Sequence, residues 1–183
     1  MSFFLRLIYI AVQALFAKKR SLLDTSVIHL RVMPNDLDLN VHMNNGRYLS
    51  LMDLGRVDVM FHSGAFTLWF TKGWQPLVAT SWCRHFKSLN LFQSFELHTR
   101  ILGWDEKWIY FEQRFVRHGE LYALGAVKAL MAGNTRLIST QELFGATGQA
   151  LRPSPPLPDW VHTWLASEKQ AIARLKQEQG PDA

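Results

Sequence analysis

The sequence predicts an α+β domain in which one long helix faces a curved antiparallel sheet. Three observations indicate this class. One amphipathic segment with the period of a helix begins near residue 45. One segment with the alternation of a strand precedes it, and four strand-like segments with short connections follow it. A single helix that packs on an antiparallel meander is an α+β layer architecture.

The bulk composition suits one globular domain with appendages. The chain has 183 residues, of which 48% are hydrophobic and 13% aromatic. Its net charge of +5 favours an anionic partner, either a phosphate-bearing small molecule or an anionic membrane surface. Without zinc-finger spacing or a recognition helix, no nucleic acid is predicted. The single cysteine, Cys83, excludes an internal disulfide and fits a reducing compartment. It lies in the strand-like run ATSWCRHF, so we interpret it as structural.

The first part of the chain, residues 1–22, contains the apolar run FFLRLIYIAVQALF. This run is shorter than the roughly 20 residues that a spanning helix needs. Arg6 and Gln13 lie seven residues apart and therefore share one face of a helix, which leaves a wide apolar side. The basic cluster KKR follows at 18–20, the reverse of the order in a signal peptide. Two interpretations stay open: an anchor that lies on the inner face of a membrane, with the domain in the cytoplasm, or an ordinary helix packed on the domain or dimer.

The main domain is expected to span residues 23–151. Residues 26–33, SVIHLRVM, alternate as a strand does. Asn44 or Asn45 is a candidate N-cap for the helix, which should end near 62–64, where Ser-Gly breaks it. The four strands that follow are predicted at 77–90, 94–104, 107–118 and 120–132. In the third of these, Glu112 and Arg114 alternate with Phe111, Gln113 and Phe115, which predicts that one face of the sheet is exposed to water.

The end of the chain reads as a linker followed by a helix. Residues 152–158, RPSPPLP, form a stiff linker that stops the sheet. The last part, 159–183, contains a solvated helix over 159–177 and a frayed tail. The tryptophans and aliphatic residues of this helix fall on one side.

The polar stretch DLDLNVHMNNGRYLSLMDLGRVD carries the candidate chemistry. Asp38, Asn40 and His42 lie in the segment that leads into the helix, where a carboxylate suits acid-base or nucleophilic work. The first helical N–H groups, near Asn45 and Gly46, have no intrahelical partner and suit the oxygen of an activated acyl carbonyl. The same residue types also make ordinary caps and Asx turns, so the residues alone leave both interpretations open.

The run D-x-D-x-N-x-H-x-N-N-x-x-Y resembles the hotdog-fold acyl thioesterases, including the plant acyl-ACP thioesterases and the 4-hydroxybenzoyl-CoA thioesterase-like group. The likeness extends from about residue 26 to about residue 140. It implies a central helix wrapped by the sheet, a homodimer or dimer of dimers, and active sites at the subunit interface. It also implies an acyl-CoA or acyl-ACP substrate, and no cofactor is expected other than the coenzyme A of the substrate. The spacings of the histidines match no metal site, so no metal is predicted. The apolar N-terminus and tryptophan-rich meander resemble the thioesterase-superfamily member six-like subgroup.

The resemblance also implies roles for particular residues. Asp38 matches the catalytic carboxylate, and Asn40 and His42 match the D-x-N-x-H arrangement of the plant-type enzymes. Asp53 falls where relatives carry an acidic residue in the helix, although a plain surface charge is the favoured interpretation.

Two basic residues fall near the expected path of coenzyme A. Arg84 and Lys87, in WCRHFKSL, lie where relatives have an aromatic-basic strand end. They are either phosphate contacts or solvated strand residues.

Three functions compete. The first is hydrolysis of an acyl thioester, with Asp38 as base or nucleophile. The second, less favoured, is hydration of an enoyl thioester, because that motif resembles D-x-N-P-x-H and places the His one residue later. The third is a non-catalytic acyl-binding or membrane-associated scaffold. The aromatic loop at 64–76, GAFTLWFTKGWQP, is predicted to cover an acyl pocket or to lie in the subunit interface. No serine-hydrolase elbow, metal spacing or P-loop is present.

Overall fold

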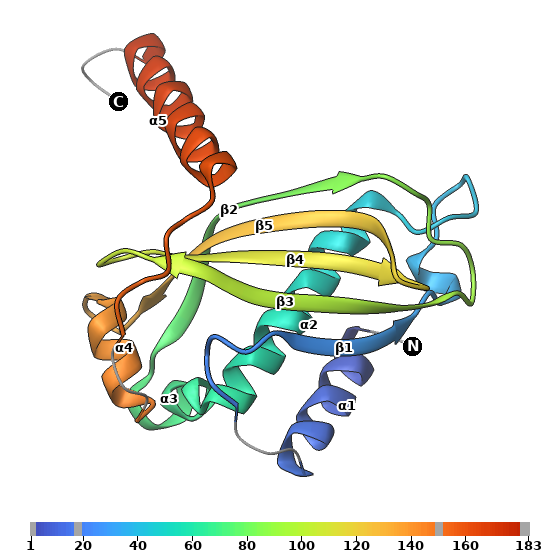
Figure 1. The fold of residues 1–183 in the computed structure, drawn as a ribbon, viewed down its shortest axis with the longest axis horizontal. Coiled ribbons are helices and arrows are strands. Elements are labelled where there is room, and N and C mark those ends of the chain that lie inside the picture. Colours follow the sequence, from blue (N-terminus) through green and yellow to red (C-terminus); the bar gives the residue numbers. More distant parts are fainter. Residues whose placement is uncertain (1–2, 17–19, 149–151, 180–183) are drawn as a thin grey trace.

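A computed structural model describes residues 3–16, 20–148 and 152–179. It has one curved antiparallel sheet with a long helix packed in its hollow side (Figure 1). The strands are β1 (Ser26–Arg31), β2 (Gln75–His85), β3 (Ser94–Trp104), β4 (Ile109–Arg117), β5 (Glu120–Ala132) and β6 (Leu137–Ile138). The helices are α1 (Phe3–Phe16), the short 3-10 helix η1 (Pro34–Asp36), α2 (Asn45–Ser63), α3 (Ala65–Lys72), α4 (Thr140–Ala146) and α5 (Asp159–Gln179).

The strand order is β1-β3-β4-β5-β2, and β6 pairs with the end of β5. The register shifts in three places: between Val78 and Thr80 in β2, between Ile101 and Gly103 in β3, and where β4 passes from Phe115 to Val116. Such bulges bend strands and increase their twist, which curves the sheet around α2. Among the described residues, β2 is one outer edge of the sheet and β1 is the other.

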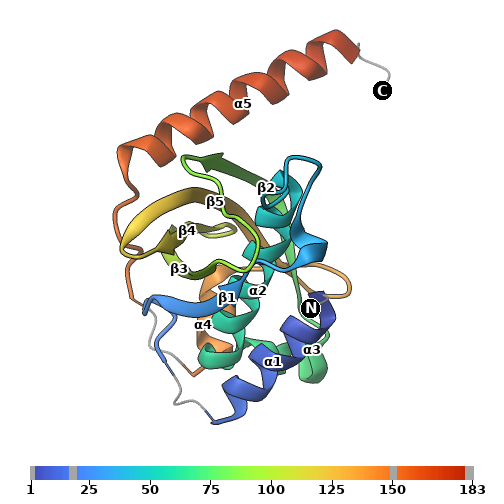
Figure 2. The ribbon, with the colours of Figure 1, turned by 90° about the vertical axis from the view of Figure 1, so that its right-hand side faces the viewer.

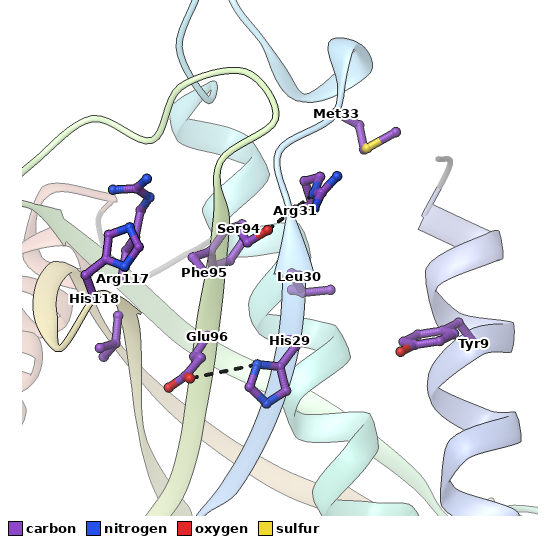
Figure 3. Close-up of a pocket in the computed structure, with 11 residues that line it drawn as sticks. Tyr9, His29, Leu30, Arg31, Met33, Ser94, Phe95, Glu96, Arg117 and His118 are labelled. Atoms are coloured by element: carbon purple, nitrogen blue, oxygen red, sulfur yellow. Dashed lines mark hydrogen bonds and ion pairs between the residues drawn. The ribbon is translucent and has the colours of Figure 1, made fainter.

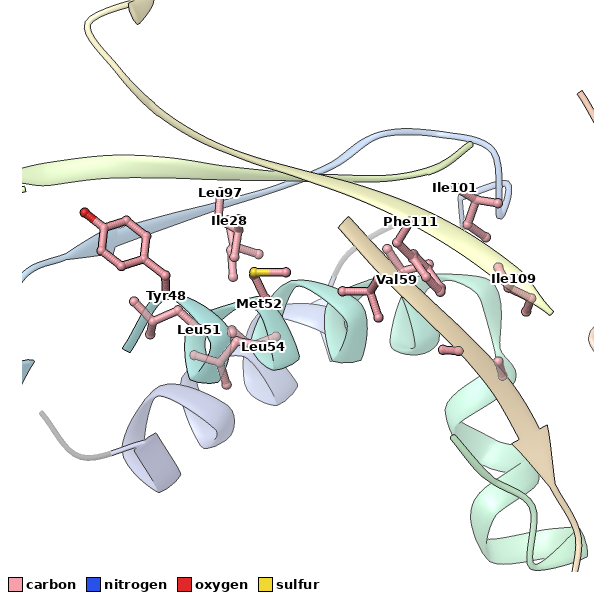
Figure 4. Packing of buried hydrophobic residues seen from close by; sticks show 14 of the residues in the cluster. Ile28, Tyr48, Leu51, Met52, Leu54, Val59, Leu97, Ile101, Ile109 and Phe111 are labelled. Carbon is pink, nitrogen blue, oxygen red and sulfur yellow. The ribbon is translucent and has the colours of Figure 1, made fainter. Parts of the chain in front are cut away.

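Helix α2 begins and ends where the sequence predicts. The Asn44 side chain caps it by accepting a hydrogen bond from the Gly46 N–H at 2.8 Å. Gly64 ends it with a φ of 82°, the left-handed conformation that glycine adopts without steric cost. Figure 4 shows its buried residues packed against the strands. Those labelled on the helix are Tyr48, Leu51, Met52, Leu54 and Val59.

A buried polar network fixes α2 on the sheet. Gln113 of β4 is fully buried and donates to the Met52 carbonyl at 2.8 Å and to Thr99 Oγ1 at 2.9 Å. Arg56 donates to Gln113 Oε1 at 2.8 Å. The helix approaches this network at Gly55, where an added Cβ would lie 2.2 Å from Thr99 Oγ1. Only glycine fits this contact between helix and sheet.

The segment 64–76 was predicted to be a loop, and this is wrong, because most of it forms α3. Gly64 and Gly73 both have a positive φ and bound eight residues without a helix breaker. Leu68 and Trp74 are buried in the core, and the ring of Phe66 lies 3.9 Å from that of Phe61. Packing of this aromatic face explains why so apolar a connection is helical.

The outer face of the sheet is less exposed to solvent than predicted. Glu112 is only 4% exposed, because it lies between two arginines of the same face. Arg100 Nε is 2.8 Å and Arg114 Nε 2.7 Å from Glu112 Oε1. The two arginine side chains cover the carboxylate, which the alternation of residue types does not reveal.

Helix α1 packs on α2 through the face that carries Arg6, an orientation that the sequence had left open. Arg6 is 2% exposed and faces the domain together with Ile10, whereas Gln13 is exposed. The apolar residues Phe4, Leu5, Ile8, Tyr9, Val12 and Phe16 are exposed. Lys18 and Lys19 of the basic cluster lie outside the described residues. Among the described helices, none is long and apolar enough to cross a membrane.

Helix α5 leaves the domain after covering part of its outer face. Trp160 and Trp164 pack edge-on against Trp82 of β2, at 5.7 and 6.1 Å between ring centroids. Glu168 pairs with Lys128 of β5 at 2.6 Å. Residues 169–178 are all exposed, and this half of the helix stands clear of the sheet (Figure 2).

Candidate active site

Five of the predicted site residues line one polar hollow of about 280 Å³. They are Asp38, Asn40 and His42 from the loop before α2, Asn45 from its first turn, and Lys87 from the segment after β2. The loop and the segment after β2 are paired directly, since the Met43 N–H donates to the Leu89 carbonyl at 2.8 Å. The end of β2 therefore completes a site that begins at the N-terminus of α2.

Residues 38 to 42 form a tight turn around the Asp38 carboxylate. Asp38 Oδ1 accepts the Asn40 N–H at 2.9 Å and lies 3.5 Å from His42 Nδ1. The Val41 N–H donates to the Asp38 carbonyl at 3.1 Å. Val41 has a φ of 63°, which is a strained conformation for a β-branched residue. Strain of this kind persists where the surrounding structure enforces it and is common at functional sites.

At the start of α2, the N–H groups of Asn45 and Gly46 were predicted to bind a carbonyl oxygen, and one of the two is already used in the helix cap. The Gly46 N–H already donates to the Asn44 side chain, as described above. Within the described part of the chain, the Asn45 N–H has no acceptor. Asn45 is therefore the better placed of the two to meet a carbonyl oxygen at the positive end of the helix dipole.

Two residues of the hollow were not predicted as site residues. Tyr48 and His85 also line it, and their ring centroids are 4.4 Å apart. Burial raises the pKa of Tyr48 to about 12 and lowers the pKa of His85, so both rings are neutral at pH 7. Tyr48 is the last residue of the motif D-x-D-x-N-x-H-x-N-N-x-x-Y, which gave it no role in the site. His85 adjoins Arg84 in the sequence, and only the contact with Tyr48 brings it to the site.

The two predicted phosphate contacts are separated. Lys87 lines the hollow and is 2.7 Å from Glu120 Oε2, a carboxylate that raises the pKa of the lysine. Arg84 is exposed on β2 outside the hollow, with its guanidinium 5.3 Å from the centroid of the Phe86 ring. Their contact with phosphate stays a prediction.

Asp53 lies apart from the hollow, at the rim of an apolar cavity of about 230 Å³ between α2 and the sheet. It is exposed and paired with Arg56, whose pKa is lowered by burial. The lining includes Ala129 and, from α3, Ala65, but none of the aromatic side chains of the segment 64–76. Figure 4 labels four other lining residues: Val59, Ile101, Ile109 and Phe111.

A third hollow, of about 520 Å³, lies beside α1 and over the ends of β1, β3 and β4 (Figure 3). Arg31, Arg117 and His118 line it. His29 Nδ1 of β1 lies 3.8 Å from Glu96 Oε1 of the neighbouring strand β3. No predicted site residue is among its lining.

The thiol of Cys83 is half-buried in β2, and burial raises its pKa to about 11. A thiol with that pKa is a poor nucleophile at neutral pH, in agreement with its structural interpretation. In the parts of the chain that the structure describes, no three His, Cys, Asp or Glu side chains gather as metal ligands.

Comparisons with known sequences point to one family. A family model described as the thioesterase-like superfamily matches residues 32–165. Protein THEM6 of Danio rerio is 31% identical over 183 residues, which cover 98% of this chain and 89% of that protein. Protein THEM6 of Xenopus laevis is 32% identical over 151 residues, which cover 81% of this chain and 71% of that protein.

Two solved structures show the same fold. A gentisyl-coenzyme A thioesterase superposes with a TM-score of 0.60 at 20% identity, over 66% of this chain and 99% of that chain. A Staphylococcus aureus protein in complex with CoA superposes with a TM-score of 0.60 at 15% identity, over 76% of this chain and 94% of that chain. At these identities, the likeness concerns the fold alone.

Proposed function

The chain belongs to the thioesterase-like superfamily and has its hotdog fold, as the sequence predicted, and we propose that it hydrolyses the thioester bond of an acyl-CoA or an acyl carrier protein. One observation carries the proposal. The polar hollow brings a carboxylate, Asp38, together with the N-terminus of α2 at Asn45. A base and a preorganised donor for an oxyanion are the two groups that acyl transfer to water needs.

Asp38 is the base in the simpler route. Its carboxylate takes a proton from a water whose oxygen adds to the thioester carbon, and the carbonyl oxygen becomes an oxyanion facing the Asn45 N–H. Collapse of this intermediate breaks the carbon–sulfur bond, and the thiolate receives the proton from Asp38. Asn40 orients the water or the carbonyl, and His42 holds the carboxylate. In the alternative route, an oxygen of Asp38 adds to the thioester carbon, and the carbon–sulfur bond breaks with release of the thiolate. Water then hydrolyses the resulting anhydride, which frees the acid and Asp38, and the released proton goes to the thiolate.

The test is thiol release from short-, medium- and long-chain acyl-CoAs by the wild type and by Asp38→Asn. Loss of a general base lowers kcat by about 10²- to 10⁴-fold, with acyl-CoA binding retained. Asp24→Asn is the matched control, since Asp24 is an exposed aspartate in a turn outside the hollow. Its turnover should equal that of the wild type.

Two other results would count against the proposal. Equal turnover by Asp38→Asn would remove Asp38 from the reaction. A folded wild type that binds acyl-CoA and hydrolyses none would favour the non-catalytic acyl-binding scaffold.

A homodimer formed through β2 is the proposed assembly. Residues 75–79 of this edge strand are exposed, including Leu77 and Val78 at 48% and 46%. An exposed apolar edge strand is a template for pairing with another strand. Two copies that pair antiparallel through β2 are related by a two-fold axis near its middle residue, Thr80. The His85 end of one copy then lies beside the Gln75 end of the other.

This pairing gives the apolar cavity a role as an acyl pocket. Within one copy, His85 at the polar hollow and Val78 at the cavity are seven residues apart on β2, roughly 23 Å at ~3.3 Å per residue. Across the two-fold axis, the hollow of one copy adjoins the cavity of its partner. The cavity of 230 Å³ has room for roughly seven or eight groups of the size of water, at ~30 Å³ each. A medium-length aliphatic acyl chain fits that space and its apolar lining.

The outer face of α1 is proposed to lie on an anionic membrane surface. Its six exposed apolar residues form one face of a 14-residue helix, which suits a peripheral position. The basic cluster KKR follows the helix in the sequence, and the chain carries a net charge of +5. Apolar burial and attraction to anionic lipid headgroups would act together.

A further inference from the structure

A buried ion pair joins α1 to the loop that carries Asp38. Arg6 of α1 and Asp36 are 2% and 1% exposed. Arg6 Nη1 donates to Asp36 Oδ1 at 3.0 Å, and Arg6 Nη2 contacts Asp36 Oδ2. Nη2 also donates to the Arg31 carbonyl at the end of β1, at 3.0 Å. The two-pronged contact fixes both the position and the direction of the carboxylate.

Asp36 in turn holds both parts of the candidate active site. Its backbone carbonyl accepts the N–H of Asn44, the residue that caps α2, at 2.8 Å. Its Oδ2 accepts the Met33 N–H at 2.9 Å, which closes the turn of η1. In Figure 3, α1 stands beside the end of β1, where Arg31 and Met33 lead toward this turn. Asp36 is therefore the point at which β1, the loop and the start of α2 meet.

The loop beyond Asp36 is held at its other end by the segment after β2, where the Met43 N–H donates to the Leu89 carbonyl at 2.8 Å and His42 forms a β-bridge with Asn90. Asp38 follows two residues later, and its N–H donates to the His42 carbonyl at 3.0 Å. The tip of the turn has no packing of its own, because Leu39 is fully exposed and Val41 is 63% exposed. An isolated β-bridge between Leu37 and Met43 closes the base of the turn. The place of the Asp38 carboxylate relative to α2 thus depends on Asp36 at one end of the loop and on the pairing of Met43 with Leu89 at the other.

We propose that Arg6 is a positioning residue for the active site: through Asp36 it fixes the turn of Asp38 against the start of α2 at Asn45. Helix α1 is then part of the catalytic scaffold and not a detachable anchor. The catalytic role of Arg6 rests on the proposed thioester hydrolysis. A displacement of about 1 Å in a reacting group lowers the rate by about 10²-fold, so a small shift of this turn matters.

The test compares Arg6→Gln with Ile10→Ala. Ile10 lies one turn further along α1, is 1% exposed, and packs in the main core. Both substitutions weaken the docking of α1, but only Arg6→Gln removes the contact with Asp36. We expect Arg6→Gln to lower kcat by about 10- to 100-fold, with KM changed by less than about threefold. Ile10→Ala should lower the melting temperature and keep the kcat of the wild type. Arg6→Lys, which keeps one charged bond to Asp36, should recover part of the loss.

A second readout does not depend on catalysis. Hydrogen exchange at the Asn44 and Met33 amides, which donate to Asp36, should be faster in Arg6→Gln than in Ile10→Ala. Equal losses of kcat in the two variants, or equal exchange at these amides, would overturn the positioning role. The wild type could hydrolyse no thioester while exchange is faster in Arg6→Gln alone. This result would refute the proposed function, but the contact between Arg6 and Asp36 would still be shown to hold the loop. If Arg6→Gln does not fold, Arg6→Lys takes its place in both measurements.

Discussion

Two aspartates in the motif, Asp36 and Asp38, are two residues apart and have opposite surroundings. Asp36 is 1% exposed and paired with Arg6, whereas the Asp38 side chain is 25% exposed and held by the N–H of its own turn. A buried carboxylate needs a fixed partner, and a reactive one must reach its substrate. The surroundings suit Asp36 to hold the loop and Asp38 to react.

Cys83 provides a prediction about reactivity. With a pKa of about 11, about 10⁻³ of the thiol is ionised at pH 8, against roughly one in four for an ordinary thiol of pKa ~8.5. We expect iodoacetamide to label Cys83 about 100-fold more slowly in the native protein than in guanidinium, as measured by mass spectrometry. Cys83→Ala should keep full hydrolytic activity. Equal labelling rates, or a loss of turnover in the variant, would contradict the structural role.

Among the helices, α1 has two faces that make different contacts. Its inner face holds Arg6 and Ile10 against the domain, and its outer face carries the exposed apolar residues. Deleting the helix would therefore disturb the Asp38 loop and the proposed lipid contact together. Substitutions confined to the outer face separate the two.

Ile8→Asp tests the lipid contact of α1. Ile8 is 58% exposed, so the change leaves the core intact. Burying one large aliphatic side chain is worth about 1.5–3 kcal/mol, and we expect at least a tenfold loss of co-sedimentation with vesicles that contain phosphatidylserine. Gln13→Asp, which adds the same charge at an exposed polar position, is the control and should keep most of the binding. If the wild type does not sediment with the vesicles, or both variants behave alike, the outer face does not bind lipid.

For the whole molecule, the decisive question is whether one active site uses parts of two copies. The polar hollow and the apolar cavity lie at opposite ends of β2. Antiparallel pairing of two β2 strands would place each hollow next to the cavity of the other copy. Neither copy alone would then hold a complete site.

Mixed dimers of Asp38→Asn and Ala129→Phe test this arrangement. Ala129 is 5% exposed and lines the cavity, so phenylalanine would fill the acyl pocket. Each variant alone should be inactive on medium-chain acyl-CoA. In an equal mixture that has exchanged subunits, half of the dimers are mixed and each has one intact site, so about a quarter of wild-type activity should return.

Two controls accompany this measurement. Sedimentation equilibrium must show a dimer, and the melting curve of Ala129→Phe must show a folded protein, since overpacking costs about 1–3 kcal/mol. No recovery in the mixture would place the hollow and its acyl pocket in the same copy.

Much of the local structure was predictable from the sequence. The strands at 94–104 and 120–132 and the cap at Asn44 lie where the pattern placed them, because alternation and capping act over a few residues. The predicted β2 ran on to residue 90, but the strand ends at His85, where the next two amides turn to the Tyr122 carbonyl. The contact that ends β2 joins distant residues, and no local pattern contains it.

The same limit applies to the site. The motif predicted that Asp38, Asn40 and His42 lie together, because they are neighbours in one turn before a helix. Their roles in catalysis stay a prediction. The way α2 lies on the sheet adds Tyr48 and His85 to the site and separates Asp53 from the hollow.

Short stretches of the chain were enough to predict the fold class, the bounds of α2 and the family, because periodicity, caps and motif spacing are properties of neighbouring residues. The folded chain, in contrast, is needed to see that Arg6 turns inward to Asp36, thirty residues away, and that apolar residues of α1 face outward. A helical pattern states which residues share a face. Which face is buried depends on partners that the chain brings together only when it folds.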